Sequence, residues 1–247
     1  MRRLLATLSL GCALLAGGAA ADESAPVVVE LFTSQGCSSC PPADRLLGEL
    51  ARRPDVLALS FNVDYWDYIG WKDPFASPAH TERQRAYGRA LGRRVVYTPQ
   101  MVIDGADDAV GSARAEVEAR IAAAAARGGK LTLRFAQDES GRNRVLIPAR
   151  TPDLPPSAVP ATVWLVLYDR EHVTPVKRGE NAGATLVNRN VVRELRRLGQ
   201  WTGEAIEMAL DIAPDAAGDG CAVIVQTGLT GPILAAAAMA IGASGGM

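Results

Sequence analysis

The feature that most constrains this chain is the segment Cys37-Ser38-Ser39-Cys40-Pro41-Pro42, in which two residues separate two cysteines. The apolar run Val27–Thr33 before it is typical of a buried strand. Proline is tolerated in the first turn of a helix, and Leu46, Leu47 and Leu50 then form one apolar stripe. The pattern predicts a strand-to-helix junction with the cysteine pair at the start of the helix.

Cysteines at such a junction are suited to redox chemistry. The helix dipole and unpaired N–H groups stabilise a thiolate and lower the pKa of the first cysteine. We therefore expect Cys37 to attack a disulfide and Cys40 to resolve the mixed disulfide. The motif alone leaves two other readings open, a static structural disulfide and half of a zinc site. The zinc reading needs two more ligands, and the chain offers only Cys221, His80 and His172, with no second CxxC. No metal and no cofactor are expected.

The first 21 residues have the layout of a secretory signal peptide. Arg2 and Arg3 precede an apolar run from Leu4 to Ala16, and small residues lead to a cleavage point after Ala21. The run is too short to span a bilayer, which needs about 20 apolar residues. We expect a periplasmic or secreted protein with no membrane span after cleavage, in a compartment where disulfides persist. Two weaker alternatives are lipidation of Cys12 and twin-arginine export through Arg2-Arg3, and in both cases the surrounding residues fit the signal poorly.

The amino-acid composition limits the classes of partner that this protein is expected to bind. The 247 residues include 26 Lys and Arg against 27 Asp and Glu, for a formal net charge of −1, and 48% are apolar. These values are typical of a globular protein. Proteins bind nucleic acids largely through Lys and Arg side chains that neutralise the phosphates. This chain has no excess of basic residues, so a nucleic-acid partner is not expected.

The chain divides at Gly128-Gly129. Before that point, runs of strand and helix character alternate as β-α-β-α-β-α, which predicts an α/β layer over residues 26–128. After the first strand and helix come a strand at 56–63, a polar surface helix at 77–91, a strand at 95–103 and a helix at 113–127. The second half, 130–241, looks mainly β and sandwich-like. Its expected strands are 131–135, 144–149, 161–169, 205–212 and 221–227, and 191–198 is either a strand or a short helix.

Pro99 lies inside an expected strand, where proline is disfavoured without a positional role. The strand before Cys37, the CxxC that opens a helix, and Thr98-Pro99 before an apolar strand together resemble the thioredoxin fold. The resemblance implies a cis Thr98–Pro99 bond, with the Thr98 backbone facing Cys37 and pairing with a substrate backbone. It also implies a buried acid that moves protons to the resolving cysteine. Glu30 is the nearest candidate, although strand alternation would turn it away if the register shifted by one residue.

A second resemblance spans nearly the whole mature chain. The segments Glu30–Asp44, Tyr65–Asp67, Gly70–Phe75, Tyr97–Met101 and Arg178–Gly183 resemble the signature of a family of secreted bacterial proteins of unknown function. This sequence departs from typical thioredoxins, because Ser38-Ser39 lies between the cysteines and Gly36, not tryptophan, precedes them. The family implies a fold but no substrate.

Three further side chains are candidates for function. Trp66, in an aromatic loop, either walls the cysteine pair and binds a partner's apolar groups or belongs to a small core. His80 either ligates copper with Cys37 and Cys40 or lies at a helix start. Cys221 is expected to be a small buried hydrophobe, and the alternative is a regulatory thiol that exchanges with the Cys37–Cys40 pair.

These observations favour an exported thiol–disulfide oxidoreductase that acts through Cys37 and Cys40, with Thr98, Pro99, Glu30 and Trp66 in supporting or substrate-binding roles. Its partners are expected to be protein thiols or disulfides in the cell envelope, together with a redox partner that resets the pair. The alternatives are a non-catalytic thioredoxin-like binding module with a structural disulfide and a periplasmic copper-handling protein.

Overall fold

The computed structural model describes residues 25–213 and 218–241. The predicted signal peptide, with Cys12 and the cleavage point after Ala21, lies outside the described residues. The first half alternates strands and helices as expected, apart from one added strand and a later start of the strand predicted at 95–103, which begins at Gln100, so that Pro99 precedes it. Its elements are β1 (Val27–Thr33), α1 (Pro41–Leu50), β2 (Val56–Asn62), α2 (Pro78–Ala90), β3 (Gln100–Ile103), β4 (Asp107–Val110) and α3 (Arg114–Arg127), with a short 3₁₀ turn η1 (Asp67–Ile69) between β2 and α2.

The second half consists almost wholly of strands. Its elements are β5 (Arg134–Gln137), β6 (Asn143–Ile147), the 3₁₀ turn η2 (Pro156–Ala158), β7 (Ala161–Pro175), β8 (Thr185–Trp201), β9 (Ile206–Ala209), β10 (Gly220–Thr227) and β11 (Ile233–Ala240). The ambiguous segment 191–198 is part of strand β8, and β7 continues past the expected end at Asp169 to Pro175. Strand β11, in the apolar tail, was not anticipated.

Within the described residues, strands from both halves form one mixed sheet in the order β11-β10-β7-β8-β2-β1-β3-β4. Strand β1 pairs in parallel with β2 and antiparallel with β3. The two halves meet where Ser60 of β2 pairs in parallel with Val191 of β8, and the Asn190 side chain donates to the Ala58 carbonyl at 2.8 Å. The boundary at Gly128-Gly129 therefore separates two stretches of chain whose strands belong to the same sheet.

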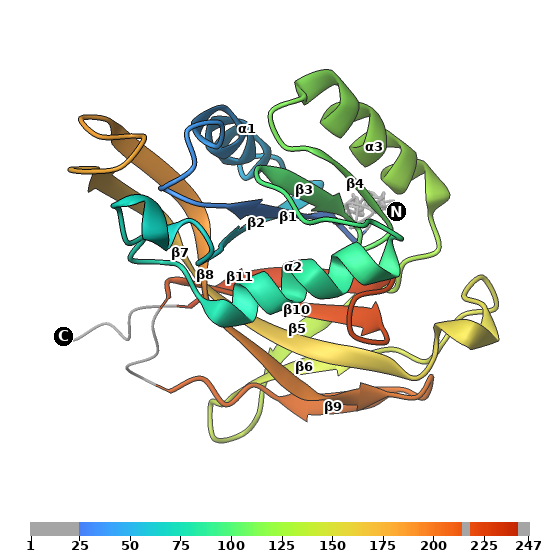
Figure 1. The fold of residues 1–247 in the computed structure, drawn as a ribbon. Helices are drawn as coiled ribbons and strands as arrows, with labels where there is room; N and C mark the ends of the chain where they lie inside the picture. Colours follow the sequence, from blue (N-terminus) through green and yellow to red (C-terminus); the bar gives the residue numbers. More distant parts are fainter. Residues whose placement is uncertain (1–24, 214–217, 242–247) are drawn as a thin grey trace, which may run out of the picture.

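Three groups of elements cover this sheet (Figure 1). Helix α2 crosses one face, over a core that draws on both halves, including Phe32, Phe61 and Val166. On the opposite face, α1 and α3 cover the first-half strands. A three-stranded sheet, β5-β6-β9, covers the second-half strands on that face, around the buried Trp201. Because strand side chains alternate between faces, neighbouring residues of β1 reach different cores, which decides where its polar residues lie.

Helix α2 was expected to be a polar surface helix, and this expectation is wrong. His80, Thr81, Arg83, Gln84 and Tyr87 are all buried. Buried polar groups are tolerated when they are paired, and the sheet below supplies the partners. The helix starts at Ser77, whose hydroxyl accepts from the Ala79 N–H at 3.2 Å, a common N-cap.

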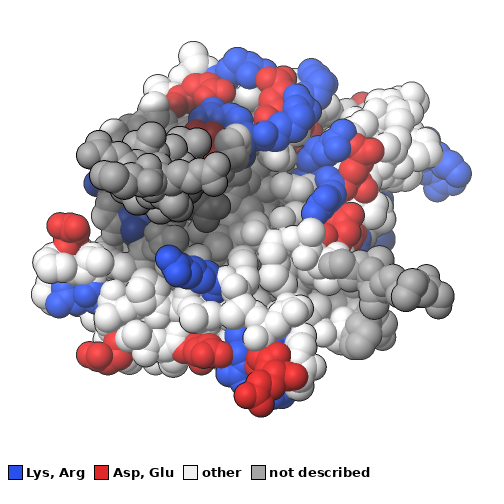
Figure 2. Space-filling model, turned by 180° about the vertical axis from the view of Figure 1, so that it is seen from behind, with Lys and Arg blue, Asp and Glu red and all other residues white. Residues whose placement is uncertain are grey.

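None of the described helices is long and apolar enough to cross a membrane. On the face shown in Figure 2, basic side chains lie intermingled with acidic ones rather than gathered in a patch of one sign.

Candidate functional site

Cys37 and Cys40 form a disulfide where β1 gives way to α1, with their Cα atoms 5.4 Å apart. Turn hydrogen bonds shape the loop: the Cys37 N–H donates to Ser34 and the Cys40 N–H donates to Cys37. Cys40 is the N-cap of α1, and Pro41 and Pro42 occupy the first turn. The predicted junction is therefore present, but the two prolines remove N–H donors that would otherwise point toward the cysteines.

The disulfide is covered. Cys37 is 1% exposed and Cys40 is 0% exposed, whereas Ser38 and Ser39 between them are exposed. The Ser39 hydroxyl lies 3.3 Å from the Cys37 sulfur. A reagent or partner can reach the backbone of the loop, but must displace side chains to reach the Cys37 sulfur.

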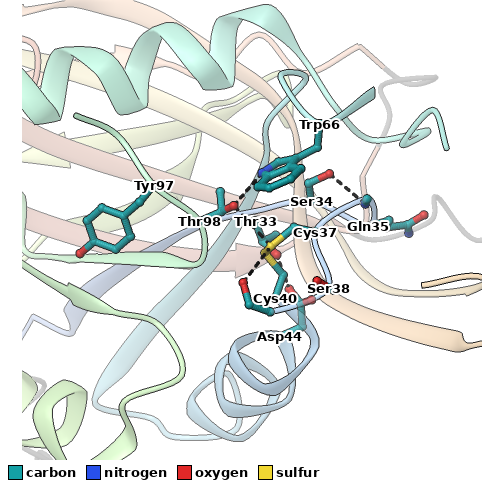
Figure 3. Close-up of a disulfide and its surroundings, with 12 residues drawn as sticks. Thr33, Ser34, Gln35, Cys37, Ser38, Cys40, Asp44, Trp66, Tyr97 and Thr98 are labelled. Carbon is teal, nitrogen blue, oxygen red and sulfur yellow. Dashed lines mark hydrogen bonds between the residues drawn. A yellow bond between two sulfur atoms is a disulfide. The ribbon is translucent and has the colours of Figure 1, made fainter. Parts of the chain in front are cut away.

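Thr98 lies against Cys37. The Thr98–Pro99 peptide bond is cis, as the resemblance implied, and the Thr98 hydroxyl donates to the Cys37 sulfur at 3.4 Å. The Trp66 indole N–H donates to the Thr98 oxygen at 2.7 Å. Figure 3 shows this chain of contacts from Trp66 through Thr98 to the disulfide. The structure thus brings together Cys37, Cys40, Thr98, Pro99 and Trp66 from three separate segments.

Glu30 lies elsewhere. It shares a face of β1 with Val28 and Phe32, beneath α2, whereas Thr33 faces α1. Its carboxylate accepts from Arg83 at 2.6 and 2.9 Å and from the Tyr87 hydroxyl at 2.5 Å. Burial alone would lower the pKa of Arg83, but the Glu30 charge raises it above its ordinary value. Glu30 therefore belongs to a buried ion pair between sheet and helix.

Asp44 is the buried acid beside the cysteines, and sequence reasoning gave it no role. It follows Cys40 by one helical turn, with its N–H on the Cys40 carbonyl at 3.1 Å, and its carboxyl accepts from the Thr33 hydroxyl at 3.0 Å. Burial raises the pKa of Asp44 to about 7, against the lowering effect of Thr33. The spacing of four residues from Cys40, which puts both on one helix face, was the available signal.

A network of buried amides supports the loop before Cys37. The Gln35 side chain donates to Thr174 at 3.1 Å and to Asn188 at 2.9 Å, and accepts from the Trp71 indole at 3.1 Å. The Gln35 N–H donates to Asp73 at 2.8 Å. Gln35 thereby ties β1, the aromatic loop and the β7–β8 hairpin together.

The segment Arg178–Gly183 is the turn of the β7–β8 hairpin, and it contacts the cysteine loop. The Asn181 side chain donates to the carbonyls of Gln35 at 2.9 Å and Cys37 at 3.0 Å. The Glu180 carboxylate accepts from the Ser38 N–H at 3.1 Å. The sequence offered this segment as part of the family signature, and the structure shows that it contacts the cysteine loop.

The copper alternative requires His80 to lie beside Cys37 and Cys40. The described residues contain no group of three His, Cys, Asp or Glu side chains placed to hold a metal ion. His80 is buried against Phe61, with its Nδ1 atom 2.9 Å from the Asn62 carbonyl, and burial lowers its pKa. Cys221 is a buried free thiol, as expected, and burial raises its pKa to about 12.

Comparison with known proteins identifies the family. A family described as "Protein of unknown function (DUF1223)" matches residues 28–226. The chain belongs to this family. The DUF1223 chain is similar to the crystal structure of protein AGR_C_4864 from Agrobacterium tumefaciens, with 33% identity and a TM-score of 0.74 over 89% of this chain and 96% of that one. It also shares its fold with HBP35 of Porphyromonas gingivalis, with 11% identity and a TM-score of 0.59 over 88% of this chain and 76% of the other. No curated protein matches.

Proposed function

We propose that this DUF1223 protein is an exported thiol–disulfide oxidoreductase with a thioredoxin-like first half, acting on proteins of the cell envelope through Cys37 and Cys40. The observation that carries the proposal is the disulfide at the start of α1 with the Thr98 hydroxyl 3.4 Å from the Cys37 sulfur. A hydroxyl in that position donates to a thiolate once the pair is reduced, and so stabilises the nucleophilic form.

In the reducing direction, the Cys37 thiolate attacks one sulfur of a partner disulfide and the other partner sulfur leaves as a thiolate. The Cys40 thiol then loses its proton and attacks the Cys37 sulfur. This re-forms the Cys37–Cys40 bond and releases the second partner sulfur. Two electrons pass to the partner, whose two thiolates take up two protons. A second redox protein, a dithiol donor, must then reduce the pair again.

Asp44 is suited to accept the Cys40 proton. It lies one helical turn from Cys40 and is 5% exposed, and a pKa of about 7 allows it to hold or release a proton near neutral pH. In this scheme Asp44 takes the place that the resemblance suggested for Glu30.

Trp66 and Thr98 serve as positioning residues. The indole N–H fixes the Thr98 oxygen, so the hydroxyl hydrogen is directed to Cys37. Thr98→Val should raise the pKa of Cys37 in the reduced protein by about one unit, because one hydrogen bond to the thiolate is lost. Thr98→Ser keeps a hydroxyl at this position and should leave the pKa of Cys37 unchanged. Alkylation rates measured against pH provide the readout, and equal values for the two variants would contradict the role.

A second candidate function draws on a different observation. Since Cys37 is 1% exposed and Cys40 0%, the disulfide could be a fixed brace in a non-catalytic binding module. Equilibration with glutathione distinguishes the two. A reduction potential far below about −300 mV marks a structural bond, whereas a higher potential favours exchange.

The direct test is trapping in the cell. Cys40→Ala should leave a partner linked to Cys37 through a mixed disulfide, which mass spectrometry can identify. Cys37→Ala should capture nothing, and the trapping variant should work equally well in a Cys221→Ala background. If neither single-cysteine variant captures a partner and the potential is structural, the oxidoreductase proposal is wrong.

A further inference from the structure

The β7–β8 hairpin places an acidic side chain on the loop between the two cysteines. In Figure 1 the far end of this orange hairpin lies beside α1, and its contact with the cysteine loop spans 142 residues of sequence, from Ser38 to Glu180. The turn is closed by hydrogen bonds from Val176 to Ala184 at 2.9 Å and from Gly183 to Val176 at 2.9 Å. It is therefore an ordered structure that can hold a side chain in place.

Contacts with the first half fix the position of this turn. Gly179 has a φ of +77°, and a Cβ there would lie 3.1 Å from the Trp71 Cβ. A positive φ and the lack of room for a side chain both favour glycine at this position. The Asn181 amide then donates to two carbonyls of the cysteine loop, Gln35 and Cys37. These contacts orient the intervening residue, Glu180, toward Ser38.

Glu180 carries its charge at the cysteine loop. Its hydrogen bonds with Ser38 lower its pKa, so the carboxylate is ionised at neutral pH. Lys177 and Arg178 of the same turn are also exposed, and buried Asp44 lies beneath the motif on α1. Among these charged groups, the Glu180 carboxylate is the one hydrogen-bonded to the backbone between the cysteines.

We infer that the turn 176–184 is part of the redox site and that Glu180 tunes it, its fixed negative charge favouring the Cys37–Cys40 disulfide over the Cys37 thiolate. This inference rests on the proposed exchange function. A disulfide is neutral, whereas the reduced pair carries a thiolate that a nearby carboxylate repels. The second half of the chain would thus make the pair a weaker oxidant, just as stabilising the reduced form makes a pair a stronger one.

The experiment compares Glu180→Gln with a matched control, Glu171→Gln, in the mature full-length protein. The amide introduced by Glu180→Gln keeps an oxygen that accepts from the Ser38 N–H, so this change removes mainly the charge. Glu171 lies on β7 of the same hairpin and pairs with Arg189. Two quantities are measured: the equilibrium constant for oxidation by glutathione, and the pH dependence of Cys37 alkylation after chemical reduction.

Glu180→Gln should decrease the equilibrium constant for disulfide formation by about three- to tenfold and lower the pKa of Cys37 by about half to one unit. The difference should shrink in 1 M NaCl, where screening acts over about 3 Å. Glu171→Gln should match wild type. If Glu180→Gln also matches wild type, or if its effect is unchanged by salt, the inference is overturned.

Asn181→Ala tests whether the hydrogen bonds of Asn181 to the cysteine loop hold Glu180 in place. Once the two Asn181 hydrogen bonds are lost, Glu180 is no longer held, so the pKa of Cys37 should fall by less than in Glu180→Gln. Combining the two changes should add nothing further. Full additivity, or no effect of Asn181→Ala, would contradict the positioning argument. Because the alkylation measurement uses chemically reduced protein, it tests Glu180 even if glutathione exchange fails, so failure of the proposed function and failure of this inference remain distinguishable.

Discussion

Glu30 of strand β1 and Asp44 of helix α1 are buried on opposite faces of that strand, and their neighbours give them different properties. Glu30 lies under α2 and receives the Arg83 guanidinium at 2.6 Å. Asp44 lies on α1 and receives a neutral hydroxyl, that of Thr33, which leaves burial to raise its pKa to about 7. The comparison teaches that burial alone does not make a carboxyl a proton carrier. Glu30 is held in a buried ion pair with Arg83, whereas Asp44, beside a hydroxyl, has a pKa that allows its protonation to change near neutral pH.

The largest expected effect is the loss of stability when the ion pair between Glu30 and Arg83 is broken. Arg83→Met should lower the free energy of unfolding by about 3–5 kcal/mol, because it leaves a buried charge on Glu30 without its partner. Arg85→Met, on the same helix, breaks the exposed pair with Glu82 and should cost less than about 1 kcal/mol. Urea unfolding of the oxidised protein measures both, and equal costs would show that the Glu30–Arg83 pair is not the buried charge pair described.

The next largest effect is the pH dependence of stability that Asp44 causes. The pKa of Asp44 rises from 3.8 when unfolded to about 7 when folded, so the folded state binds more protons between these values. The contribution of Asp44 to the free energy of unfolding is therefore at its maximum below about pH 4. It decreases by about 4 kcal/mol as the pH rises to about 7. Asp44→Asn should remove that fall. If wild type and Asp44→Asn lose the same stability between about pH 4 and pH 8, Asp44 does not titrate as described.

The kinetic counterpart of that prediction tests the proton role. Asp44→Asn should slow the release of a mixed disulfide by Cys40 by about 10²-fold, the typical contribution of a positioned acid or base, and should remove a kinetic pKa near 7. Glu49→Gln is the matched control, since Glu49 is an exposed acid on the same helix, paired with Arg114. Stopped-flow measurement on a glutathione mixed disulfide provides the rates, and equal rates for the two variants would exclude the proton role.

The smallest expected effect is the change in the pKa of Asp44 when its hydrogen-bond partner, the Thr33 hydroxyl, is removed. The Thr33 hydroxyl lowers the pKa of Asp44, so Thr33→Val should raise it above its present value by about one unit. Thr33→Ser should leave it in place. Carboxyl carbon shifts in an NMR titration report the change, and a lower pKa in Thr33→Val would show that the hydroxyl is not the stabilising partner.

Much of the first half could be predicted because its signals are local. The apolar run of β1, the two prolines that open α1 and the Thr98-Pro99 segment each give a pattern readable within a few residues, and Thr98 does lie against Cys37. Glu30 was given the wrong surroundings because its partner Arg83 comes from a helix whose polar pattern looks exposed. Only the fold shows that the sheet buries that pattern and pairs it.

The features that sequence reasoning missed depend on long-range contacts. Asp44 is buried because β8 lies along α1 and brings Asn188 to the Gln35 network, and Asn188 lies 153 residues after Gln35 in sequence. Helix-dipole reasoning led to backbone N–H groups as the donors around Cys37, whereas the structure places two hydroxyls there, those of Thr98 and Ser39. Neither hydroxyl follows from the cysteine spacing.

The parallel pairing of β2 with β8 has a practical consequence. Every residue of β2 is buried in the intact protein, and a fragment ending at residue 128 would expose this apolar strand as an open sheet edge, which promotes association with other chains. The same cut would remove the turn that covers the cysteine loop. The disulfide-bearing half is therefore poorly suited to recombinant expression by itself, and truncations meant to simplify its biochemistry should be expected to aggregate.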